Sequence, residues 1–250
     1  MTHRPGKKRR RRLLPLLLVI LFCAGFFQWS NRSLQIQRFP YASPRLPEGF
    51  DGCVAVQLSD LHGAVFGEDN QQLIDAVREQ EPDYIFLTGD LLDQYRRTPH
   101  SYAVDLGRRL AAIAPTYFVT GNHEWTLPDV RGLKRSLEEA GVTVLTNEAV
   151  VLERGGDRIV LAGIDDPNGF AGQKSPEAVA QEVRDAYGDP FWLLLAHRNN
   201  YFEGDYSRLG ADLVISGHGH GGLIRLPFTD GLFSCLLYTS DAADELDGVD

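Results

Sequence analysis

Short apolar runs that alternate with amphipathic stretches constrain the fold of this chain most strongly. The runs lie at 53–58, 84–87, 116–119, 142–145, 159–162, 191–195 and 213–215, and their length and composition are typical of buried strands. Three intervening stretches repeat apolar residues at the spacing of one helix face: Leu73, Ile74 and Val77; Leu106, Leu110 and Ile113; Val130, Leu133 and Leu137. This alternation predicts an α/β fold.

Two local patterns add to this prediction. Ser175 followed by Pro176 and Glu177 is typical of an N-cap with proline at the first helical position, and predicts a helix toward Tyr187. Between 142 and 162 two apolar runs follow each other without a helix, which predicts a hairpin or a second sheet there.

A block of polar residues follows five of the predicted strands. Because ligands of open α/β sheets bind beyond the carboxyl ends of the strands, these blocks predict a site at that edge. Five of the seven histidines lie in them. The blocks are Ser59-Asp60-Leu61-His62, Gly89-Asp90-Leu91-Leu92-Asp93, Gly121-Asn122-His123-Glu124, Ala196-His197 and Gly217-His218-Gly219-His220.

Each block taken alone has an ordinary structural explanation. Asp60 with His62 is a common turn pairing, Asp90 after glycine suits a turn or helix cap, and His197 suits a buried structural histidine. The tetrad of glycine, asparagine, histidine and an acid differs, since this composition predicts it only about 0.003 times by chance. The ordered combination therefore indicates a functional site.

The candidate ligands are imidazoles, carboxylates and one amide oxygen, a set that suits borderline or hard divalent cations. Seven candidates exceed what one metal ion normally draws from protein, whereas two ions roughly 3.5–4 Å apart can share a carboxylate. Asp90 is the natural bridge. The three cysteines lie far apart, which excludes a disulfide framework and a thiolate cluster. The candidates are Asp60, His62, Asp90, Asn122, His197, His218 and His220.

The order D-x-H, G-D-x-x-D, G-N-H-E, H and G-H-x-H resembles that of calcineurin-like metallophosphoesterases, over about 54–226. The sequence at 58–63 looks most like that of the membrane-anchored or exported bacterial branch of the family. The resemblance implies a layered α/β/β/α sandwich with the active site at the carboxyl ends of the strands. One departure is local: relatives often have proline two residues after the lone histidine, where Asn199 stands here.

The resemblance also implies roles for these residues. Asp60, His62 and His220 would hold one metal, Asn122, His197 and His218 the other, and Asp90 would bridge them. His123, oriented by Asp93, would donate a proton to the leaving group while metal-bound hydroxide attacks phosphorus.

The implied function is a two-metal phosphoesterase that hydrolyses phosphomonoesters or phosphodiesters. The two ions would be manganese, iron or zinc, and no residue is assigned to an organic cofactor. The alternative is a catalytically silent metal-binding scaffold or interaction domain on the same fold. Retention of His123 and of every candidate ligand favours catalysis. Arg96, Arg97 and Arg198 lie near the predicted site and are candidates to contact a second phosphate.

Charge is unevenly distributed along the chain. The net charge is -9, yet residues 1–12 hold seven of the 25 basic residues and no acid, so 18 basic residues face 34 acidic ones in the rest. An acidic body repels nucleic-acid phosphates, so no broad nucleic-acid surface is expected.

The basic residues 1–12 precede an apolar run at 13–29, which predicts a membrane anchor or a signal sequence. We favour an uncleaved anchor, because Phe22 lies where a cleavage site or a lipobox needs another residue. The positive-inside rule then predicts a single-pass protein with its catalytic domain outside the cytoplasmic membrane. Secretion after cleavage is the alternative.

The remaining chain divides into a proline-containing tether at 30–52, the metallophosphoesterase domain at 53–234 and an acidic tail at 235–250. The tail has two interpretations that stay open: a disordered terminus, or sequence that is not part of the natural chain. The sequence indicates no oligomeric state.

Overall fold

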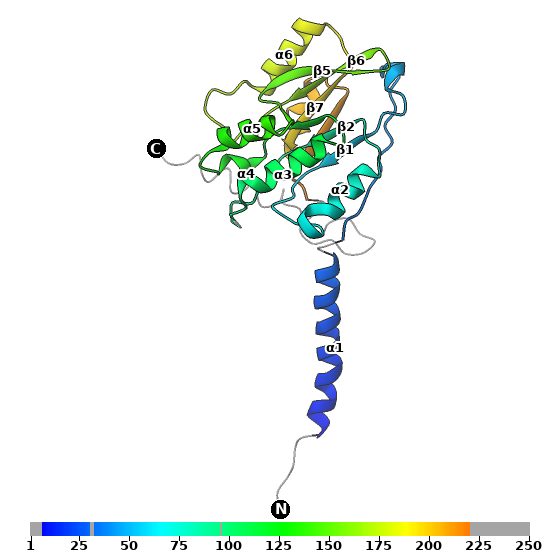
Figure 1. Cartoon of the computed structure of the whole chain (residues 1–250), viewed down its shortest axis with the longest axis vertical. Coiled ribbons are helices and arrows are strands. Elements are labelled where there is room, and N and C mark those ends of the chain that lie inside the picture. The colour runs from blue at the N-terminus through cyan, green and yellow to red at the C-terminus, as the bar shows by residue number, and fades with distance from the viewer. Residues whose placement is uncertain (1–6, 31–32, 96, 221–250) are drawn as a thin grey trace, which may run out of the picture.

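The computed structural model describes residues 7–30, 33–95 and 97–220, and its strands form two four-stranded sheets (Figure 1). The first sheet is parallel, in the order β1-β2-β3-β4. In the second sheet, ordered β5-β6-β7-β8, only the β5–β6 pair is antiparallel. The strands are β1 (Ala55–Leu58), β2 (Tyr84–Leu87), β3 (Thr116–Phe118), β4 (Thr143–Val144), β5 (Glu148–Arg154), β6 (Asp157–Gly163), β7 (Trp192–Arg198) and β8 (Leu213–Gly217).

Side chains that alternate along each strand divide the core into three layers. On β2, Ile85 and Leu87 pack with the helices outside the first sheet, whereas Phe86 packs between the sheets. On β7, Leu193 faces the first sheet and Leu194 faces the helix outside the second. The predicted α/β/β/α sandwich is therefore confirmed.

Four helices cover the two outer faces. The first sheet is covered by α2 (Gln71–Arg78), α3 (His100–Ala111) and α5 (Val130–Glu139), and the second by α6 (Pro176–Tyr187). The predicted cap of α6 is present, since the Ser175 hydroxyl accepts a hydrogen bond from the Ala178 amide. The other helical elements are α1 (Lys7–Ser30), α4 (Asn122–Trp125), η1 (Glu48–Phe50), η2 (Glu68–Asn70), η3 (Asn199–Tyr201) and η4 (Tyr206–Arg208).

Every predicted apolar run overlaps a strand. Between 142 and 162 a hairpin or a second sheet was expected, and both occur: β5 and β6 form a hairpin, and they belong to the second sheet. The turn residues of the hairpin, Gly155 and Gly156, have φ of 59° and 89°, as a two-residue hairpin turn of the primed type requires. Strand β5 itself was not predicted. It lies at the edge of its sheet, and only Leu152 of its seven residues is buried.

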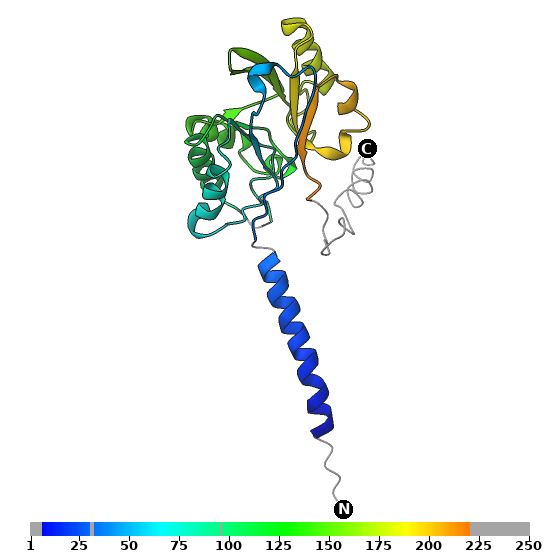
Figure 2. The same cartoon turned by 90° about the vertical axis from the view of Figure 1, so that its right-hand side faces the viewer.

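The N-terminal part of the chain leads to the domain through an irregular segment. Helix α1 extends away from the domain (Figure 2), and in the described parts of the chain no helix is both long and apolar enough to span a bilayer. The transmembrane helix predicted at 13–29 is thus not supported. After α1, the Tyr41 hydroxyl donates to the Asp212 carbonyl, Arg45 pairs with Asp189, and Phe50 is buried between the sheets. The predicted domain end at 234 and the tail at 235–250 lie outside the described residues.

Candidate metal centre

Both sheets contribute candidate ligands at the carboxyl ends of their strands. Asp60 and His62 follow β1, Asp90 follows β2, and Asn122 begins α4, four residues after the end of β3. From the second sheet, His218 and His220 follow β8, which runs toward the end of the domain from which α1 projects (Figure 2).

His197 corrects the sequence-based expectation in one respect. It was predicted to follow its strand, but it lies inside β7, between Ala196 and Arg198, where the register with β8 shifts. An extra residue in a strand bends it and redirects a side chain, and such bulges are frequent beside active sites. The irregularity thereby turns His197 toward the other candidate ligands.

Strained backbone is concentrated in this cluster. Ten described non-glycine residues have positive φ, and five of them are candidate ligands, with φ between 47° and 67°. Such conformations cost energy and persist only where the surroundings impose them, so their clustering indicates a functional site. The five residues are Asp60, His62, Asp90, His218 and His220.

One group of ligand atoms is formed by Asp60, His62 and His220. The two Nε2 atoms of His62 and His220 lie 3.1 Å apart, and Nε2 of His220 lies 3.4 Å from Oδ1 of Asp60. Nε2 of His62 also lies 3.7 Å from Oδ2 of Asp90. Asp90 therefore adjoins this group.

The second group surrounds Nε2 of His197. That atom lies 3.1 Å from Oδ1 of Asn122, 3.2 Å from Nδ1 of His218 and 3.3 Å from Oδ2 of Asp90. The Nδ1 of His197 lies 2.7 Å from the carbonyl of Thr88, which orients the ring so that Nε2 faces the cluster.

The donor chemistry of this cluster fits divalent cations. With Nδ1 of His197 donating to Thr88, a neutral His197 has only a lone pair at Nε2, and this lone pair faces the oxygens of Asn122 and Asp90. Acceptor atoms that converge in this way require a cation or a proton between them. Nε2 of His218 is buried and has no hydrogen-bond partner in the described residues. The structure thus brings together all seven candidates, with Asp90 between the two groups.

The pKa values of His197, His218 and Asp90 show which of these clustered residues carries a proton. Burial, followed by the charge of the nearby His197, lowers the pKa of His218 to about 4. Burial also lowers the pKa of His197, but the hydrogen bond and the charge of Asp90 outweigh it and raise that pKa to about 9. His197 in turn lowers the pKa of Asp90 against the effect of burial. A proton on His197 therefore supplies the positive charge that a metal ion would supply.

Metal uptake at pH 7.5 should therefore release a proton. The pKa of His197 is raised, so its proton is present at pH 7.5, leaves as the metal binds, and is already absent well above pH 9. Calorimetric titration with Mn²⁺ in buffers of different ionisation enthalpy should show a buffer-dependent heat at pH 7.5. A heat independent of the buffer would contradict this account.

His123 lies beside the first group, since one of its ring nitrogens lies within 4.8 Å of the ligand atoms of His62 and Asp90. The backbone amide of His123 donates to Oδ1 of Asp90 at 2.8 Å, and its ring packs edge-on against that of His62, with centroids 4.5 Å apart. Nδ1 of His123 lies 4.0 Å from Oδ1 of Asp93, which is longer than a hydrogen bond. Oδ1 of Asp93 accepts from the amide of Tyr95 at 2.7 Å.

Glu124 is an organising residue to which sequence reasoning gave no role. Its fully buried carboxylate accepts hydrogen bonds from the amides of Asp90 (2.8 Å), Gly121 (2.8 Å) and Leu92 (3.1 Å). It thereby joins the loops after β2 and β3. Its position three residues after Gly121 matches a capping box, which was the available signal. Burial, followed by the charge of Asp90, raises the pKa of Glu124 to about 7.

Replacing Glu124 by glutamine should destabilise the fold by about 1–3 kcal/mol. Glutamine has one side-chain oxygen, so at least one of the three buried amides would face an NH₂ group instead of an acceptor. Urea denaturation measures the loss. The exposed Glu138→Gln on α5 is the matched control and should change the unfolding free energy by less than about 0.5 kcal/mol. Equal effects for the two variants would contradict the role of Glu124.

Comparison with known proteins identifies the family. Residues 55–222 match the calcineurin-like phosphoesterase family. The chain belongs to this family. Membership supports the general activity predicted above, that of a phosphoesterase dependent on divalent metal.

Several relatives match over most of the chain. "Uncharacterized metallophosphoesterase YkoQ" of Bacillus subtilis is 33% identical over 85% of this chain and 78% of its own length. An Aquifex aeolicus protein named "Uncharacterized metallophosphoesterase" is 30% identical over 83% of this chain and 78% of its own length. "Transmembrane protein with metallophosphoesterase domain" of Danio rerio is 33% identical over 78% of this chain. The chain spans 47% of that relative's length.

Proposed function

We propose that this chain is a two-metal phosphoesterase that hydrolyses phosphomonoesters or phosphodiesters. Asp60, His62 and His220 would hold one cation, and Asp90 would contact both. Asn122, His197 and His218 would hold the other. The supporting observation is that two groups of ligand atoms adjoin at Asp90, as a pair of ions sharing a carboxylate requires.

Two bound cations would neutralise the phosphate charge and lower the pKa of a bound water to about 7, which makes it a nucleophile at neutral pH. The protein's own residues complete the reaction. His123 would donate a proton to the leaving oxygen, and Asp93 would orient its ring once substrate tightens the site. Glu124 would keep Asp90 and Asn122 at a fixed position relative to each other by holding their loops together.

The test uses the full chain loaded with Mn²⁺. Elemental analysis should find two equivalents of metal, and the loaded protein should hydrolyse chromogenic phosphomonoesters or phosphodiesters in a reaction that a chelator abolishes. If the protein binds two equivalents of metal and hydrolyses neither ester, the scaffold alternative is correct. If it binds no metal, both are wrong.

We further propose that the domain acts outside the cytoplasmic membrane, as in the membrane-anchored or exported bacterial branch. Support comes from the basic residues at 1–12 followed by the apolar residues at 13–29, and from the name of the Danio rerio relative. Protease treatment of intact cells should degrade the catalytic domain while a cytoplasmic marker survives. A protected domain would overturn this proposal.

A further inference from the structure

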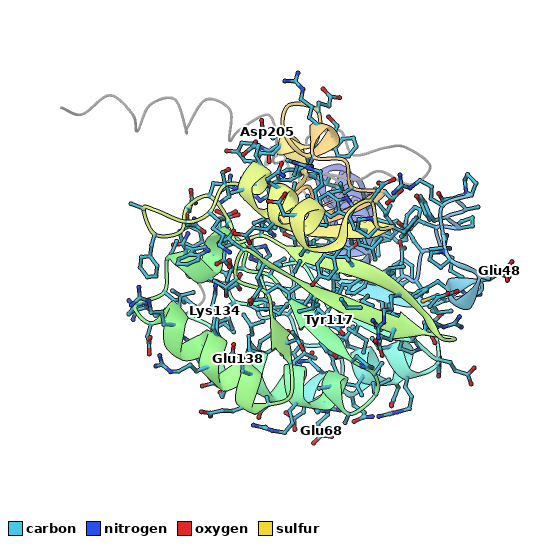
Figure 3. All side chains as sticks on the ribbon, turned by 90° about the horizontal axis from the view of Figure 1, so that it is seen from above. Glu48, Glu68, Tyr117, Lys134, Glu138 and Asp205 are labelled. Carbon is cyan, nitrogen blue, oxygen red and sulfur yellow. The ribbon has the colours of Figure 1, made fainter. Side chains whose placement is uncertain are left out.

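A pocket lies beside the metal centre, on the side of α4 and α5. Its volume is about 290 Å³, close to the lower limit for small-molecule sites. Trp125 and Phe170 form an aromatic wall, with ring centroids 5.0 Å apart. Lys134 of α5, labelled in Figure 3, lies at its base with Asp165. We call this cavity the Trp125 pocket.

The charged groups at the base of the Trp125 pocket neutralise each other. The buried Lys134 ammonium donates to both oxygens of Asp165, at 2.8 and 2.7 Å, and to the hydroxyl of Thr146 at 3.0 Å. Asp165 also accepts from Thr120 at 2.7 Å. The charges of Lys134 and Asp165 are therefore paired with each other, and neither residue is a candidate to bind a charged ligand.

Arg131 is different. Its guanidinium carbon lies 4.5 Å from the centroid of the Phe170 ring, and no described carboxylate pairs with it. A guanidinium stacked on an aromatic face keeps its N–H groups free around the edge of its plane, where they bind phosphate or carboxylate. Arg131 therefore gives the Trp125 pocket an unpaired positive charge.

Two chain segments join the Trp125 pocket to the metal centre. Asn122 and Trp125 are the first and last residues of α4, only about 4.5 Å apart along the helix axis. Asp165 and Asp166 are adjacent, and Asp166 holds Arg198, the neighbour of His197, through contacts of 2.7 and 3.2 Å. The Trp125 pocket is therefore connected to the metal centre through α4 and through the segment that contains Asp165 and Asp166.

The contacts of Arg198 and Arg131 indicate which arginine can bind a second phosphate of the substrate, and the answer differs from the expectation from sequence. The sequence suggested Arg96, Arg97 and Arg198. Arg198 is engaged by Asp166, and Arg96 lies outside the described residues. Arg97 is among the described residues but does not line the Trp125 pocket, whereas Arg131 is an arginine that does.

We propose that the Trp125 pocket binds a second anionic group of the phosphate-ester substrate through Arg131. The inference rests on the proposed function. It identifies the substrate class as esters that carry another phosphate or carboxylate beyond the one that reacts.

The test compares two chromogenic esters that differ by one phosphate: thymidine 5′-(p-nitrophenyl phosphate) and the same compound with a 3′-phosphate. For the wild-type protein with Mn²⁺, the second phosphate should raise kcat/KM roughly tenfold, mainly through KM, as expected for a charge-assisted hydrogen bond. Arg131→Gln should remove this preference and leave the rate on the ester without the 3′-phosphate unchanged. Arg135→Gln, an exposed neighbour on α5, should keep the preference.

Binding gives a readout that does not need catalysis. Calorimetry should show that thymidine 3′,5′-bisphosphate binds the Mn²⁺-loaded wild type roughly tenfold more tightly than thymidine 5′-phosphate, and that Arg131→Gln loses this difference. No preference in the wild type, or an equal preference in Arg131→Gln, would overturn the inference. If binding follows the expectation and neither ester is hydrolysed, the pocket assignment stands and the proposed function fails.

Discussion

Replacing Asp90 by asparagine should lower kcat by roughly a thousandfold, which corresponds to about 4 kcal/mol of transition-state stabilisation. Oδ2 of Asp90 lies within reach of both groups of ligand atoms, 3.7 Å from His62 and 3.3 Å from His197. An uncharged amide in this position removes the negative charge on which the two proposed cations would depend. Elemental analysis should find fewer than two equivalents of metal, and steady-state kinetics should show the loss in kcat.

The matched control is Asp105→Asn. Asp105 is exposed on α3 and pairs with Arg108 at the surface, so its replacement should change neither metal content nor rate. Asp90→Asn that keeps two equivalents of metal and the wild-type rate would show that Asp90 is not shared by two ions. Circular dichroism establishes that the variant is folded.

Replacing His123 by alanine should lower kcat by roughly 10²–10⁴-fold for an alkyl phosphate, the usual contribution of a proton donor. The loss should be much smaller for a p-nitrophenyl ester, whose leaving group departs without a proton. One ring nitrogen of His123 lies within 4.8 Å of the ligand atoms of His62 and Asp90, but His123 is not one of the seven assigned ligands, so the metal content should stay at two equivalents.

The comparison of leaving groups separates proton donation from a structural role. Equal losses on the two esters, or a loss of metal, would show that His123 supports the site and does not donate the proton. His100→Ala is the control, since His100 lies at the start of α3 and belongs to none of the potential metal-binding groups. It should behave as wild type.

The period-two and helical patterns predicted most of the fold because each strand and helix buries one face in a defined layer. Ile85 and Leu87 pack under the helices and Phe86 between the sheets, as strict alternation requires. Strand β5 was not predicted because an edge strand needs few apolar residues, so its sequence lacks a clear apolar pattern. Leu152 is its single buried residue, and pairing with β6 supplies the remaining order.

The candidate ligands were predictable because six of the seven follow a strand within a few residues, and the seventh, His197, lies near the end of β7. The features that position them were not, since they depend on contacts between distant segments. The Thr88 carbonyl that orients the His197 ring lies 109 positions away, and the bulge at His197 depends on the register between β7 and β8. Neither leaves a local sequence pattern.

The candidate ligands come from both sheets: Asp60, Asp90 and Asn122 extend from the first, and His197, His218 and His220 from the second. Cations bound there would link the two sheets of the sandwich, which also contact each other through apolar packing and scattered polar contacts. Bound ions would then hold the two sheets together at the carboxyl ends of their strands. A chain whose two sheets had not yet packed on each other would be unable to retain its ions.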